Sequence, residues 1–167
     1  LAPPVVFGTF AAASILITIG TLFVESGMTA ALIQRSDRLE EAAATAFVST
    51  LVGGLGLTLV SAALAPLVGL FFEGDDITAV ALAVSGMNLL NATTVVPDAL
   101  LQRRFAYVRR VVVDPLWMAT YGGVAAIGLA TGLGVWGLVI ATYASGVVRV
   151  ALVWGFVRWR PSPRLAS

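Results

Sequence analysis

Residues 115–148 have the sequence PLWMATYGGVAAIGLATGLGVWGLVIATYASGVV, 34 uncharged residues between Asp114 and Arg149. A helix needs about 20 apolar residues to cross a hydrocarbon core about 30 Å thick. The stretch is therefore long enough for two crossings, and glycines at its centre, residues 131–137, predict a tight turn between them. We expect a hairpin of two transmembrane helices here.

Further apolar segments occupy most of the remaining chain. The predicted spans are residues 5–26, 45–67, 77–101, 111–131 and 135–157. Hydrophobic residues make up 59% of the chain and charged residues 11%, against about a quarter charged in soluble domains. The sequence therefore predicts an all-α, polytopic transmembrane helix bundle of about five spans, in a single domain over residues 1–167.

The second apolar segment is longer than one perpendicular crossing requires. Residues 42–72 are 31 consecutive uncharged residues. Either a tilted helix accommodates the excess, or a break does so at Gly53, Gly54, Gly56 or Pro66.

All ten basic residues are arginines, and all of them except Arg149 occur in alternate connections. Arginines follow the first, third and fifth predicted spans, whereas the other connections are acidic or uncharged. The positive-inside rule makes the arginine-bearing connections cytoplasmic, the N-terminus external and the C-terminus cytoplasmic. An external start with five spans predicts that one preceding helix is missing.

Absent residue types exclude several chemistries. The chain has no Cys and no His, which excludes thiol nucleophiles and the usual transition-metal ligands. It also has no Walker-type phosphate loop. We therefore expect no catalytic residues, no metal site, no cofactor and no enzymatic activity.

Three of the predicted spans carry polar residues at helical spacing, each set on one helix face. The sets are Ser14, Thr18, Thr21 and Glu25; Asn88, Asn91, Thr94, Asp98 and Gln102; and Thr142, Ser145 and Arg149. Because lipid solvates such groups poorly, they should face inward and line a polar path. The alternative is that the Ser, Thr and Asn side chains only hydrogen-bond neighbouring helices.

Arg149 is the main candidate for a functional residue, because it precedes the predicted end of its span by eight residues, about 12 Å of helix. It would bind an anionic substrate or pair with an inward carboxylate, unless its side chain extends to the interface. Asp98 and Glu25 lie nearer the predicted span ends. Each is either part of such a site or a salt-bridged helix end.

Four arginines lie between the third and fourth predicted spans: Arg103, Arg104, Arg109 and Arg110. Their place between two spans favours contact with anionic lipid or a pyrophosphate head group over nucleic-acid binding. Two further features concern packing. Gly128 and Gly132 form a small-xxx-small pattern that permits close helix approach, and Trp136 and Trp154 mark the two membrane interfaces.

Several short motifs follow one another along the chain. They are Ala31-Leu-Ile-Gln-Arg35, Leu64-Ala-Pro-Leu67 with Phe71-Phe72, Val96-Pro-Asp-Ala-Leu-Leu-Gln-Arg-Arg-Phe105, and Gly134-Val-Trp-Gly-Leu138 followed by a span and Trp159-Arg-Pro161. In this order and spacing the chain resembles the polysaccharide, O-antigen and teichuronic-acid flippases of the multidrug/oligosaccharidyl-lipid/polysaccharide exporter superfamily.

The resemblance implies a larger, two-lobed protein of the bacterial cytoplasmic membrane that moves polyprenyl-pyrophosphate-linked glycan by alternating access. The spans here would be the second to sixth helices of an incomplete N-terminal lobe. Arg149, Arg103 and Arg104 become candidates for pyrophosphate or acidic-sugar contact. Glu25 and Asp98 become candidates for coupling to a proton or sodium ion.

The resemblance also implies partners, namely membrane lipid, the lipid-linked glycan, and a glycan polymerase or glycosyltransferase. On this basis, replacing Arg149 with alanine should abolish glycan export without changing the abundance of the protein. Two other functions stay open. One is export of drugs or small cations by the same superfamily, which the basic residue disfavours, and the other is a membrane scaffold without transport activity.

Overall fold

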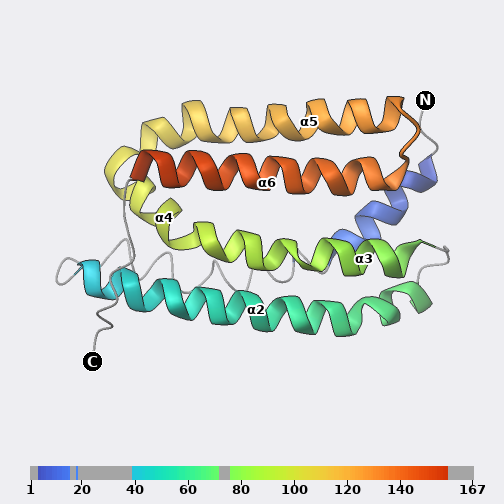
Figure 1. Cartoon of the computed structure of the whole chain (residues 1–167), viewed down its shortest axis with the longest axis horizontal. Coiled ribbons are helices and arrows are strands. Elements are labelled where there is room, and N and C mark those ends of the chain that lie inside the picture. Colours follow the sequence, from blue (N-terminus) through green and yellow to red (C-terminus); the bar gives the residue numbers. More distant parts are fainter. Residues whose placement is uncertain (1–3, 16–17, 19–38, 72–75, 158–167) are drawn as a thin grey trace.

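The computed structural model describes residues 4–15, 18, 39–71 and 76–157 of the chain (Figure 1). Its helices are α2 (Leu39–Phe71), α3 (Ile77–Ser85), α4 (Met87–Val108), a π-helix η1 (Arg109–Val113), α5 (Asp114–Ala130) and α6 (Val135–Val157), preceded by an apolar helix over Pro4–Ile15. Four helical segments are long and apolar enough to cross a membrane. The predicted all-α polytopic bundle of about five spans is confirmed.

Helices α2 to α6 lie side by side along one common axis, and the helix over Pro4–Ile15 runs obliquely to them (Figure 1). Helix α2 packs against α3 and α4, α4 packs against α6, and α6 packs against α5. Helices α4 and α6 run in one direction, and α2 and α5 run in the other. The α4–α5 connection therefore lies at the same end of the bundle as Leu39 and Val157. In the sequence, the other arginine-bearing segments directly precede Leu39 and follow Val157.

Helix α2 is a single α-helix of 33 residues that includes Pro66. It continues through Gly53, Gly54 and Gly56, so the break considered from the sequence does not occur. At 1.5 Å per residue the helix is about 50 Å long, which exceeds a hydrocarbon core of about 30 Å. Tilt, or extension beyond the core, therefore accommodates the excess length.

The third predicted span consists of two helices, α3 and α4, that meet at Gly86. A hydroxyl from α6 contacts the chain at this interruption: Tyr143 donates a hydrogen bond to the carbonyl of Ala83. Without the hydroxyl, that carbonyl would accept a hydrogen bond only from the backbone of its own helix. A Cβ atom at Gly86 would collide with the Tyr143 hydroxyl, so the close contact also requires a residue without a side chain.

The turn between α5 and α6 has the hydrogen bonds of a Schellman motif. The amide of Leu133 donates to the carbonyl of Gly128, 3.0 Å away, and the amide of Gly132 donates to the carbonyl of Leu129, 3.3 Å away. Gly132 has a φ of 82°, in the left-handed region that glycine tolerates best. The hairpin expected from the sequence is therefore present, with α5 ending at Ala130 and α6 beginning at Val135.

Helices α5 and α6 approach closely where two glycines face each other. A Cβ atom built on Gly128 would lie 2.6 Å from Cα of Gly137, which is too short for any side chain. The sequence predicted Gly128 correctly as a contact glycine but assigned the wrong second residue. Gly132 belongs to the turn, and a Cβ atom there would meet nothing within 4 Å.

Candidate polar site between the helices

Buried polar side chains occupy the middle of the bundle, between two apolar clusters. One cluster, at the η1 end, includes Ala46, Val96 and Val153. The other, at the opposite end, includes Ala65, Val84 and Val139. Polar residues that lie between these positions on α2, α4 and α6 include the buried Ser61, Asn88, Thr94 and Ser145 and the half-buried Asn91, Thr142 and Arg149. We call this set the polar band.

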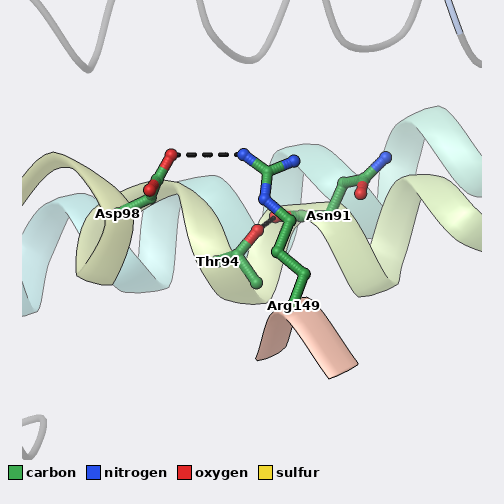
Figure 2. A network of polar contacts seen from close by, with 4 residues as sticks. All are labelled: Asn91, Thr94, Asp98 and Arg149. Carbon is green, nitrogen blue, oxygen red and sulfur yellow. Dashed lines mark hydrogen bonds and ion pairs between the residues drawn. The ribbon is translucent and has the colours of Figure 1, made fainter. Parts of the chain in front are cut away.

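Arg149 and Asp98 form an ion pair at the edge of the polar band. Nη2 of Arg149 on α6 donates to Oδ2 of Asp98 on α4, at 3.2 Å. Figure 2 shows the guanidinium reaching toward Asp98, with Asn91 and Thr94 on the same helix as Asp98. The Arg149 and Asp98 side chains are 20% and 10% exposed. Pairing with an inward carboxylate was one of the alternatives that the sequence left open for Arg149.

The ion pair lies well inside the helices. Arg149 precedes the end of α6 at Val157 by eight residues, and Asp98 precedes the end of α4 at Val108 by ten residues. These separations are about 12 and 15 Å of helix. Asp98 therefore lies within α4 and not at its last turn. Charges at such positions are costly and persist where they pair with each other or serve a function.

Trp117 provides a third contact to the ion pair. The guanidinium carbon of Arg149 lies 5.7 Å from the centroid of the Trp117 ring on α5, within the range of a cation–π interaction. The ring covers part of the charged group that would otherwise meet lipid. Three helices, α4, α5 and α6, thus contribute to the surroundings of Arg149.

Asn88 links α4 to α2. Its Nδ2 donates to Oγ of Ser61 at 3.1 Å, and both side chains are buried. Within the described part of the chain, Oδ1 of Asn88 is buried and accepts no hydrogen bond. A buried amide oxygen in this state is a suitable acceptor for an ordered water or a ligand hydroxyl.

The hydroxyls of the polar band bond mainly to their own helices. Thr94 donates to the carbonyl of Asn91 at 2.8 Å, and Ser145 donates to the carbonyl of Thr142 at 2.9 Å. Thr18, on the first predicted span, is exposed and donates to the carbonyl of Ser14 at 3.2 Å. Each of these bonds gives the hydroxyl an acceptor within its own helix.

Not every predicted site residue can be placed. Glu25 lies outside the described residues. The backbone at Arg103 and Arg104 belongs to α4, and that at Arg109 and Arg110 belongs to η1. Their side chains lie outside the part that the structure describes.

Sequence reasoning missed the contact between Trp154 and Thr93. Nε1 of Trp154 donates to the backbone carbonyl of Thr93 at 3.2 Å. Trp154 was predicted to mark a membrane interface, and in the structure its indole bonds to α4. Pro97 could have indicated that the Thr93 carbonyl needs a donor from elsewhere, because a proline leaves the carbonyl four residues before it without a helical donor.

Together, the apolar helices and the buried ion pair define a polytopic helical membrane protein with a polar interior. A family model described as polysaccharide biosynthesis protein matches residues 1–167. The chain therefore belongs to the polysaccharide biosynthesis protein family. Comparison with curated proteins and with solved structures gave no match.

Proposed function

We propose that this chain is part of a flippase that moves polyprenyl-pyrophosphate-linked oligosaccharide across the bacterial cytoplasmic membrane, without catalysing a reaction. The observation that carries the proposal is the Arg149–Asp98 ion pair inside a bundle of apolar helices. Membership of a polysaccharide biosynthesis family supports a glycan as the substrate. A polar band inside such a bundle suits the passage of a polar head group.

Arg149 is the residue through which the substrate anion would bind. A guanidinium carries five N–H donors, and the contact with Asp98 uses Nη2. Further donors can therefore bind a phosphate or sugar carboxylate. Asn88, Asn91 and Ser145 would hydrogen-bond sugar hydroxyls, and Thr18 and Glu25 would extend the path on the first predicted span.

The remaining parts of the proposal concern the two membrane surfaces. Arg103, Arg104, Arg109 and Arg110 would contact anionic lipid or the pyrophosphate head group on the cytoplasmic side. The N-terminus would then be external and the C-terminus cytoplasmic. A second lobe would complete the path, a proton or sodium ion would drive it through Asp98 or Glu25, and a glycan polymerase or glycosyltransferase would act beside it.

Deleting the gene should cause lipid-linked oligosaccharide to accumulate in the cytoplasmic leaflet. The accumulation should be detected with a membrane-impermeant lectin or glycosidase on vesicles of known orientation. The intact gene should restore the external fraction. An unchanged distribution between the leaflets after deletion would refute the flippase proposal.

A scaffold without transport activity is the second candidate, favoured by the hydroxyls that bond to their own helices. Water access separates the two functions. Because the chain has no Cys, single cysteines can be introduced at Thr18, Asn91 and Ser145. We expect a hydrophilic thiol reagent to label Asn91→Cys and Ser145→Cys at least about tenfold faster than a lipid-exposed control. The reason is that the reagent reacts with the thiolate, which forms where the thiol meets water.

Val52→Cys is a suitable control for that measurement, because Val52 is 66% exposed on the apolar surface of α2. Equal, slow labelling at all positions of the polar band would favour a scaffold.

A further inference from the structure

Pro97 interrupts the hydrogen bonding of α4 next to Asp98. Proline has no backbone N–H, so it cannot donate to the carbonyl of Thr93, the residue four positions earlier. Pro97 lies inside α4 and is fully buried. Within a membrane, a carbonyl freed in this way needs a donor from another helix or side chain.

Trp154 on α6 supplies that donor. Its indole Nε1–H donates to the carbonyl of Thr93 at 3.2 Å. The same ring packs edge-on against Phe47 of α2, with centroids 5.7 Å apart. A single side chain thus joins α2, α4 and α6 at the point where Pro97 leaves a carbonyl of α4 without its helical donor.

Helix α6 forms hydrogen bonds with α4 on both sides of Pro97. Trp154 bonds to Thr93 before the proline, and Arg149 bonds to Asp98 directly after it. The hydroxyls of Thr93 and Thr94 donate to carbonyls three residues earlier, Leu90 and Asn91. Such back-bonding bends helices, so this part of α4 depends on external contacts for its direction.

We propose that Trp154 is a positioning residue for the Asp98–Arg149 ion pair. By satisfying the Thr93 carbonyl, its indole sets the direction of α4 after Pro97 and thereby the direction in which Asp98 points. The effect on export rests on the proposed function, whereas the effect on the ion pair does not.

The decisive experiment compares Trp154→Phe in two backgrounds. Phenylalanine keeps an aromatic ring against Phe47 but removes the N–H. Pro97→Ala restores a backbone N–H that can donate to Thr93, so the indole is no longer needed. From the strength of hydrogen bonds between membrane helices, W154F should lower export about threefold to tenfold in the natural sequence. In the P97A background it should change export less than about twofold, because the helical N–H replaces the indole.

A second measurement tests the state of the ion pair directly and does not depend on export. In protein labelled with 15N-arginine and held in lipid nanodiscs, the Arg149 signal is assigned through its absence in R149K. We expect W154F to accelerate hydrogen exchange at the Arg149 guanidinium about threefold or more, and the P97A/W154F variant to exchange like P97A alone. An exchange rate unchanged by W154F, or accelerated equally in both backgrounds, overturns the inference.

The two proposals can fail separately. Normal export by the R149A/D98N variant would refute the proposed role of the ion pair in transport. The exchange rates would still decide whether Trp154 positions Asp98, because they depend on the contacts and not on the substrate.

Discussion

Replacing Arg149 with alanine is expected to abolish export of lipid-linked glycan and also to reduce the amount of folded protein. The substitution leaves Asp98, whose side chain is 10% exposed, without its ion-pair partner. Removing one partner of a buried ion pair typically costs about 3–5 kcal/mol, and the 20% exposure of Arg149 favours the lower value. The sequence alone predicted that the abundance of the R149A variant would be unchanged. Because Arg149 pairs with Asp98, we now expect a lower abundance.

The measurements are the amount of protein in isolated membranes, the thermal unfolding temperature in detergent, and the distribution of glycan between leaflets. The matched control is the double variant R149A/D98N, which removes both charges. It should recover most of the abundance and unfolding temperature, because no unpaired charge remains. It should still fail to export glycan, because the anion-binding guanidinium is absent. Export at the natural level by this variant would remove Arg149 from the mechanism.

Replacing Gly128 with valine is expected to destabilise the protein strongly by separating α5 from α6. The added Cβ atom would lie 2.6 Å from the Cα atom of Gly137, and backbone atoms cannot move aside as a flexible side chain can. Overpacking of this kind typically costs about 1–3 kcal/mol. We expect a lower thermal unfolding temperature and less protein in the membrane.

Gly123→Val is the matched control, because a Cβ atom at Gly123 on the same helix meets nothing within 4 Å. Both variants change helix propensity in the same way, so the difference between their unfolding temperatures measures the contact with Gly137. Equal unfolding temperatures for the two variants would show that the Gly128–Gly137 contact does not hold the hairpin together.

Local rules predicted the hairpin and the inward polar faces of α4 and α6, but they failed for the exposed Thr18 on the first predicted span and where a side chain from another helix intervened. The 34 uncharged residues with central glycines were sufficient to predict α5, its turn and α6, because length and turn chemistry are local properties. The interruption between α3 and α4 was missed, and so was the contact made there by the hydroxyl of Tyr143, which lies sixty residues after Ala83 in the chain.

In the candidate site, too, the sequence predicted local features but not the contacts between distant segments. Helical spacing placed Asp98 and Arg149 on polar faces, since spacing along a helix determines which residues share a face. Spacing carries no information about which faces meet, so the sequence did not pair these two residues. It also did not place Trp117 over the guanidinium or Trp154 on the Thr93 carbonyl.

The sequence by itself determined that this chain forms a bundle of membrane helices, because apolar length and the distribution of charge are set by composition along the chain. It also determined which residues are too polar to face lipid. Only the tertiary structure decided that Arg149 meets Asp98, that Gly128 meets Gly137 while Gly132 makes no close contact, and that α6 bonds to α4 on both sides of Pro97. These contacts depend on the rotation and relative height of packed helices, which side-chain shapes and hydrogen bonds from distant segments establish together.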